Sequence, residues 1–232
     1  MKKTYNKLVK GIKKYFKKSG LNKAVIGLSG GIDSALSLRL VSDAIGNENV
    51  LALLLPERGL TKWQNVKDAI NLCKSLKIKY KIIEINPILD YFKKIRQNNV
   101  SWTNLKPRIR MLILYDFANV NNALVVGTSN KTELRLGYFT KHGDGACDLE
   151  VIGNLYKTDV WELSKYLRLP EDIINKIPSA ELSQGQTDEG DIGEKYKEID
   201  KMLKGNKKIS NRIKTLIEKN RHKTEKIPII KK

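Results

Sequence analysis

Four short apolar runs, separated by segments with helical periodicity, constrain the fold of this chain more than any other feature. The runs are rich in Val, Ile and Leu and lie at residues 23–28, 50–55, 79–85 and 123–128. Short apolar runs are typical of strands buried on both faces, and strands that alternate with helices form a parallel sheet. The sequence therefore predicts an α/β fold, in which a twisted parallel sheet has helices on both faces.

Helical periodicity occurs before, between and after these runs. Lys3 to Lys18 has apolar residues at three- and four-residue steps and a basic outer face. Further helices are predicted at residues 33–44, 62–76, 87–97, 107–120, 156–168, 170–175, 192–203 and 208–220. Pro107 is expected in the first turn of its helix. Polar residues predict loops at 97–104, 138–148 and 178–191.

The formal net charge of +19 comes from the two ends of the chain. Residues 1–23 contain nine lysines and no acid, residues 195–232 contain fourteen Lys and Arg against four acids, and the middle is balanced. Charge confined to the ends is no evidence for a nucleic-acid partner. Neither a run of about eighteen apolar residues nor a secretion signal is present, so we expect a cytoplasmic protein outside the membrane.

We expect a single domain over residues 1–232. A core at about 21–170 would lie between an N-terminal helix at 1–20 and a helical C-terminal segment at about 171–232. Cys73 falls within a predicted helix, and Cys147 has no visible activating neighbour, so neither is predicted to be a nucleophile.

The segment GLSGGIDSA at residues 27–35 carries the main functional signal. It lies between a predicted strand and a predicted helix, and Ser29, Gly30 and Gly31 allow backbone N–H groups to approach an anion at the helix N-terminus. Asp33 would repel a phosphate unless Mg²⁺ lies between them. The alternative is that Asp33 caps the helix. Neither GxxxxGK[ST] nor GxGxxG occurs, which argues against P-loop and dinucleotide-binding folds.

The string SGGIDS resembles the signature of the ATP pyrophosphatases, which cleave ATP between its α- and β-phosphates. Four further strings follow in the order found in ammonia-dependent NAD synthetases: LKPRIRM (105–111), GTSNKTE (127–133), GYFTKHGDGACD with LYKTDVWELS (137–148 and 155–164), and PSAELSQGQTDEGDIG (178–193). The chain is similar to this family over nearly its whole length. The resemblance implies an adenine nucleotide α-hydrolase-like, Rossmann-type three-layer fold. It also implies that ammonia and ATP convert deamido-NAD to NAD through an adenylated nicotinate carboxylate, releasing AMP and pyrophosphate.

The resemblance also assigns roles to individual residues. It places Mg²⁺ on Asp33 and Glu133, and it gives catalytic roles to Asp33, Lys141 and Lys157. The ATP-binding residues would be Gly27, Leu28, Ser29, Gly30, Gly31, Ile32, Asp33, Ser34, Thr128, Lys157 and Ser179. The residues that bind deamido-NAD would be Arg108, Lys141, Asp148, His222 and Lys223. The residues alone leave an alternative for three of these: a surface carboxylate for Glu133, a helix N-cap for Thr128 and a solvated side chain for His222.

The family further implies a homodimer whose substrate site is built from both subunits, and ammonia as the nitrogen donor, because we find no glutaminase domain. His142 is not needed as a base, since the substrate carboxylate is already an anion and ammonia is already a nucleophile. The alternative function is a tRNA-modifying adenylating enzyme of the same superfamily, which the charge would suit.

Overall fold

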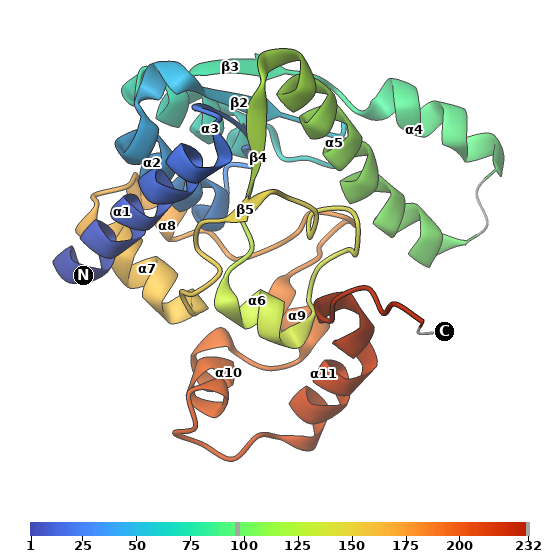
Figure 1. Ribbon diagram of the computed structural model, residues 1–232. Coiled ribbons are helices and arrows are strands. Elements are labelled where there is room, and N and C mark those ends of the chain that lie inside the picture. The colour runs from blue at the N-terminus through green and yellow to red at the C-terminus, as the bar shows by residue number, and fades with distance from the viewer. Residues whose placement is uncertain (96–97, 231–232) are drawn as a thin grey trace.

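The structure of the chain, a computed structural model, describes residues 1–95 and 98–230. Its centre is a five-stranded parallel sheet with the strand order β3-β2-β1-β4-β5 (Figure 1). The strands are β1 (Lys23–Gly27), β2 (Val50–Leu54), β3 (Lys79–Ile82), β4 (Ala123–Gly127) and β5 (Leu149–Glu150). The predicted parallel sheet is confirmed. β3 is shorter than expected, and β5 was not predicted.

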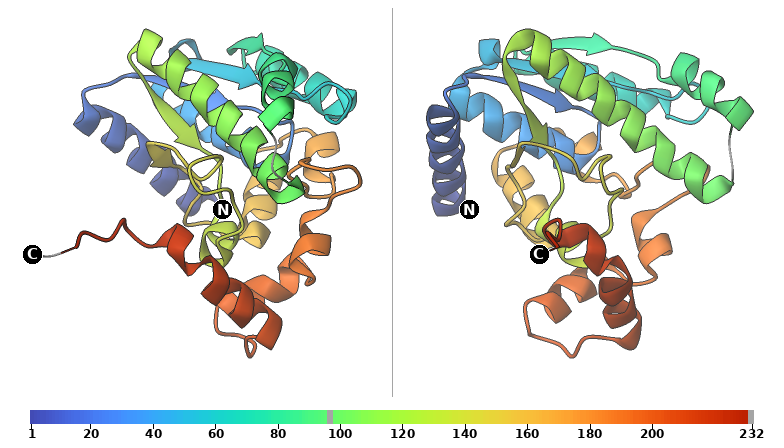
Figure 2. Two further views of the ribbon diagram at one scale, coloured as in Figure 1. Left: turned by 90° about the vertical axis from the view of Figure 1, so that its right-hand side faces the viewer. Right: turned by 45° about the vertical axis from the view of Figure 1, so that its right-hand side comes forward.

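Helices cover both faces of the sheet (Figures 1 and 2). One face packs against α1 (Lys2–Ser19), α2 (Ile32–Ile45), α3 (Trp63–Ser75), α7 (Lys157–Tyr166) and α8 (Glu171–Ile174). The other face packs against α4 (Asn86–Phe92) and α5 (Asn99–Asn121). The side chains of β1 alternate accordingly, because Ala24 and Ile26 belong to the first core and Val25 to the second.

The C-terminal part of the chain forms a third hydrophobic cluster below the carboxyl edge of the sheet (Figure 1). It contains α6 (Lys131–Leu136), α9 (Asp188–Ile192), α10 (Tyr196–Leu203) and α11 (Asn211–Thr224). The two basic C-terminal helices are thus confirmed, whereas α9 lies where a loop was expected. Among the described residues, no helix combines the length and the apolar character that a membrane span requires.

The strand order brings two loops together. The chain moves from β1 outward to β2 and β3 and then returns to the opposite side of β1 as β4, which pairs Ile26 with Val126. Gly27 and Gly127 are the last residues of these two strands. The carboxyl edge between such strands is a topological switch point, where α/β proteins bind ligands. The segments 27–35 and 127–133 therefore meet at this edge.

The prediction around residue 100 is wrong. α5 begins at Asn99, so most of the expected loop is helical, while residue 97 lies outside the described residues. Asn98 caps the helix by accepting a hydrogen bond from the N–H of Ser101 (2.8 Å). Pro107 consequently lies inside the helix and not in its first turn. Trp102 and Leu105 pack against the core, and this packing offsets the backbone hydrogen bond that proline removes.

Candidate active site

The glycine loop between β1 and α2 ends at the N-terminus of a 14-residue helix. Gly30 has a φ of 80°, a conformation that favours glycine, and Gly31 is the first residue flanking the helix. The hydroxyl of Ser34 donates to the Gly31 carbonyl (3.0 Å), and the hydroxyl of Ser29 accepts from the Gly31 N–H (3.2 Å). Backbone N–H groups and two hydroxyls thus gather where the helix dipole favours an anion.

The other residues of this segment support the loop through the backbone. Leu28 and Ile32 are buried in the core, and the Leu28 N–H donates to the carbonyl of Leu53 in β2 (2.9 Å). Their side chains therefore point away from the loop surface. Any contact with a nucleotide would come from their backbone, as for Gly27 at the end of β1.

Three charged side chains from three elements meet beside the loop. The Lys157 ammonium, at the start of α7, forms an ion pair with Asp33 in the first turn of α2. It also lies 3.7 Å from Oε1 of Glu133 in α6. Lys157 is only 1% exposed, and its ammonium lies 5.1 Å from the centre of the Tyr196 ring. The side chain of Glu133 is 15% exposed, so Glu133 is not the surface carboxylate of the alternative interpretation.

Asn130 holds both carboxylates in place. Its side-chain nitrogen donates to Oδ1 of Asp33 (2.9 Å), and its Oδ1 accepts from the N–H of Glu133 (3.0 Å). Oε2 of Glu133 accepts in turn from the Asn130 N–H (3.1 Å), which completes a capping box. Asn130, and not the half-buried Thr128, is therefore the N-cap of α6, and Asp33 does not cap α2.

The cluster contains more acidic groups than basic ones. Burial raises the pKa of Glu133 well above its ordinary value, and Asp33 raises it further, whereas Lys157 lowers it. Burial also raises the pKa of Asp188, which accepts a hydrogen bond from the Tyr196 hydroxyl (3.1 Å). For Lys157, burial lowers the pKa, but Asp33 and Glu133 outweigh that effect and leave it above its ordinary value. A further cation would be stabilised here.

Asp33 and Glu133 fit a metal ion that is shared with a bound phosphate. Mg²⁺ usually takes one or two protein carboxylates and completes its shell with water and phosphate oxygens. The two carboxylates converge on one cation, the Lys157 ammonium, and both remain partly exposed. The described residues contain no group of three or more His, Cys, Asp or Glu that could hold a metal by themselves. The pair therefore suits an ion that arrives with its phosphate.

Four of the five residues predicted to bind deamido-NAD gather around the loop 138–148. The Lys141 ammonium donates to the carbonyl of His222 (2.7 Å), and the Arg108 guanidinium donates to the carbonyl of Lys141 (3.3 Å). Lys223 donates to the carbonyls of Gly137 (2.9 Å) and Phe139 (3.0 Å). These contacts attach α11 and α5 to the loop within the chain.

Asp148 is the last residue of this loop, and its carboxylate is bonded at the edge of the sheet. Its Oδ2 accepts from the N–H of Val125 (2.7 Å), and its Oδ1 accepts from the hydroxyl of Tyr115 (3.3 Å). Burial and Glu150 raise the pKa of the Cys147 thiol above its ordinary value, which agrees with the expectation that it is no nucleophile. Cys73 lies within a helix, as predicted, and is buried in the core.

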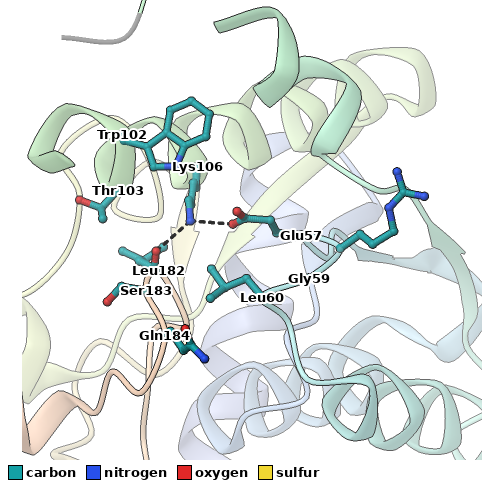
Figure 3. A pocket seen from close by; sticks show the side chains of 10 residues that line it. Glu57, Gly59, Leu60, Trp102, Thr103, Lys106, Leu182, Ser183 and Gln184 are labelled. Atoms are coloured by element: carbon teal, nitrogen blue, oxygen red, sulfur yellow. Dashed lines mark hydrogen bonds and ion pairs between the residues drawn. The ribbon is translucent and has the colours of Figure 1, made fainter. Parts of the chain in front are cut away.

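A cavity of about 490 Å³ lies between the loop after β2, α5 and the segment 178–187 (Figure 3). Lys106 crosses it, because its buried ammonium contacts Oε2 of Glu57 (2.8 Å) and donates to the carbonyl of Leu182 (2.8 Å). The hydroxyl of Ser179, a predicted ATP ligand, donates to the carbonyl of Gln186 (2.7 Å) and thus folds the segment itself.

Comparison with known proteins places the chain in a family. A family model described as NAD synthase matches residues 4–231. The chain belongs to the NAD synthase family. The NH3-dependent NAD+ synthetase of Archaeoglobus fulgidus is 48% identical over 220 residues, which cover 91% of this chain and 89% of that protein.

Two solved structures are similar to the chain over almost their whole length. The structure of the NMN synthetase of Francisella tularensis superimposes with a TM-score of 0.93 at 38% identity. The match covers 99% of this chain and 98% of the Francisella chain. The NH3-dependent NAD synthetase of Campylobacter jejuni, in complex with the nitrate ion, has a TM-score of 0.82 at 38% identity and covers 99% of both chains. Membership of this ligase family decides against the tRNA-modifying alternative.

The sequence did not point to four residues that the structure places at or near the site: Asn130, Lys106, Lys176 and Asp188. One signal was available for Asn130, because Asn followed three residues later by Glu is a capping-box pattern. The others carry no comparable signal. Lys106 and Lys176 are two of many lysines in a basic chain, and only the tertiary structure shows that they contact backbone carbonyls near the site.

Proposed function

We propose that this member of the NAD synthase family converts deamido-NAD to NAD with ATP and ammonia. The observation that carries the proposal is the glycine loop at the N-terminus of α2, next to Asp33, Glu133 and Lys157. The substrate carboxylate attacks the α-phosphorus of ATP and pyrophosphate leaves. Ammonia then attacks the acyl carbon, the bond to AMP breaks, and the new amide nitrogen loses a proton.

The chain's own residues would act mainly by binding and charge. The loop N–H groups, with Ser29 and Ser34, bind the departing pyrophosphate, and the buried Lys157 stabilises negative charge that develops during phosphoryl transfer. Asp33 and Glu133 would hold Mg²⁺, which neutralises phosphate charge when bound. His142 is exposed and needs no role as a base. Thr128 and Ser179 are proposed to contact ATP.

Deamido-NAD is proposed to bind at the loop 138–148. Arg108, Lys141 and Lys223 bring positive charge to this loop beside His222, and the substrate is a dinucleotide with a phosphate at each nucleotide. Asp148, at the edge of the sheet next to the loop, would contact the neutral part of the substrate.

We also propose a homodimer. α5 exposes Leu112 and Val120, which are 62% and 78% accessible, and the same helix carries Arg108. Apolar side chains exposed on one helix favour an interface with a second copy. This arrangement would let Arg108 approach substrate bound by the partner. The cytoplasmic location and the absence of nucleic-acid and membrane partners stay predictions.

The second candidate substrate is the mononucleotide that corresponds to NMN. The observation in its favour is the similarity to the NMN synthetase of Francisella tularensis, whose TM-score is 0.93. The chemistry at the carboxylate is identical, and the two substrates differ only in the AMP half, which the mononucleotide lacks. Measuring kcat/KM for deamido-NAD and for nicotinate mononucleotide on one preparation decides between them.

The function is tested with purified protein, deamido-NAD, ATP, Mg²⁺ and ammonium. We expect equal amounts of NAD, AMP and pyrophosphate. Formation of ADP in place of AMP, or no amide product from either nucleotide, would exclude the proposal. Leaving out ammonium or deamido-NAD provides the controls.

A further inference from the structure

The glycine loop rests directly on the first turns of α3. A Cβ atom at Gly30 would lie 2.2 Å from the carbonyl oxygen of Asn65, so the backbones of the loop and of α3 are in contact. The contact leaves the loop little room to move toward α3. It does not by itself fix the orientation of the peptide group between Gly30 and Gly31, because two glycines allow that group to rotate with little steric cost.

Within the loop, the Gly31 N–H of this peptide group donates to the Ser29 hydroxyl (3.2 Å), and Lys176 adds a constraint from outside the loop. It lies between α8 and the segment 178–187, and its ammonium donates to the carbonyl of Gly30 (2.9 Å). The same ammonium forms an ion pair with Oδ2 of Asp68 in α3 (2.5 Å). Asp68 is buried, and its Oδ1 accepts a hydrogen bond from Gln64 (2.7 Å). One cation thus joins the loop to a fixed point on α3.

We propose that Lys176 is a positioning residue for ATP, a role that rests on the proposed function. The Gly30 carbonyl and the Gly31 N–H belong to one planar trans peptide and point in opposite directions. While Lys176 holds the carbonyl, that oxygen is turned away from the phosphate site and the N–H stays inside the loop. A rotated peptide would direct the carbonyl oxygen at the phosphate and repel it.

The same elements connect the loop to the segment 178–187. The Asn65 side chain donates to Oε1 of Glu181 (2.8 Å), and Glu181 has a φ of 47°. α3 therefore supports the glycine loop through Asn65 and Asp68 and the neighbouring segment through Asn65. Lys176 lies just before that segment in the chain, so its bond to Gly30 makes the shape of the glycine loop depend on the segment being in place.

The test is the variant Lys176→Met, compared with the parent protein in steady-state kinetics. We expect the KM for ATP and the inhibition constant of pyrophosphate each to rise about tenfold, the size typical for loss of a hydrogen bond to a charged group. The KM for deamido-NAD should change less than twofold. Lys176→Arg keeps the charge and the donors and should restore both constants to within threefold of the parent. Lys165→Met, an exposed lysine of α7, is the matched control.

A folded Lys176→Met protein with an unchanged KM for ATP would overturn the inference, and so would an equal rise in the KM of both nucleotides. If that variant does not fold, Asp68→Asn removes only the ion pair and should raise the same two constants about threefold; no rise contradicts the inference. Titration calorimetry with Mg²⁺ and pyrophosphate measures the affinity of the protein for pyrophosphate without turnover. Comparing this affinity in Lys176→Met and in the parent therefore tests the positioning role of Lys176 even if the parent protein forms no NAD.

Discussion

At the scale of the residue, Asp33 links the glycine loop to the charged cluster around Lys157. Its carboxylate contacts both Lys157 and Asn130. We expect Asp33→Ala to lower kcat/KM at least about a hundredfold, because charged groups around a transferring phosphoryl group contribute several kcal/mol to the transition state. Pyrophosphate release measures turnover, and circular dichroism checks folding. Asp172→Ala, at an exposed aspartate of α8, should stay fully active, and a folded Asp33→Ala protein with normal turnover would contradict the role.

Glu150 makes stability depend on pH. Burial raises its pKa to about 7, although its Oε2 accepts a hydrogen bond from the Ser129 N–H (3.0 Å). The folded protein therefore binds a proton that the unfolded chain, with an ordinary pKa near 4.5, releases. Stability should fall as the pH rises between these two values.

The measurement is urea unfolding of the parent and of Glu150→Gln at pH 5 and pH 8. Relative to Glu150→Gln, the parent should lose about 2–3 kcal/mol of unfolding free energy between these pH values, about 1.4 kcal/mol for each pKa unit. Glu171→Gln, at an exposed glutamate, should follow the parent. Parallel curves for the parent and Glu150→Gln would show that Glu150 does not titrate in this range.

At the scale of the element, the sequence predicted what depends on local pattern. The buried strands β1, β2 and β4 and the glycine loop were placed correctly because apolar runs and turn residues act over a few positions, whereas β3 is shorter than predicted and mostly exposed. The start of α5 was not, since packing of Trp102 and Leu105 against the core overrides the proline at residue 107. β5 has only two residues and forms only because β4 lies beside it. Of the site, motifs identified Asp33, Glu133 and Lys157, but neither Asp188 nor the tertiary contacts of Lys176.

Hydrogen bonds from α11 hold the loop 138–148 in place like a clamp, and they give a prediction for the whole helix. Lys223 donates to two carbonyls at the start of that loop, and Asn220 donates to the carbonyl of Leu136 (3.1 Å). Lys223→Met should raise hydrogen exchange in residues 137–145 about tenfold, because lost carbonyl contacts lower the cost of local opening. Lys219→Met, at an exposed lysine of the same helix, is the control. Unchanged exchange in Lys223→Met would show that the loop holds its shape without the clamp.

At the scale of the molecule, charge is divided between parts with different tasks. The positive excess lies in α1 and in the C-terminal group, whereas the cluster around Lys157 is acidic. A basic exterior would favour the approach of ATP and of a dinucleotide, and an acidic centre would favour the proposed Mg²⁺ ion. The net charge thus agrees with two small anionic substrates and requires no nucleic acid.

The proposed homodimer gives the prediction that depends on the whole assembly. Leu112→Glu combined with Val120→Glu places charge on the exposed apolar positions of α5 and should convert the dimer to a monomer in sedimentation velocity experiments. If both subunits build the substrate site, the monomer should show a KM for deamido-NAD at least about tenfold higher, with a smaller change for ATP, whose loop lies within one protomer. Tyr166→Glu, at an exposed aromatic residue of α7, should stay dimeric. A parent protein that sediments as a monomer, or a fully active monomeric variant, would show that one chain completes the site alone.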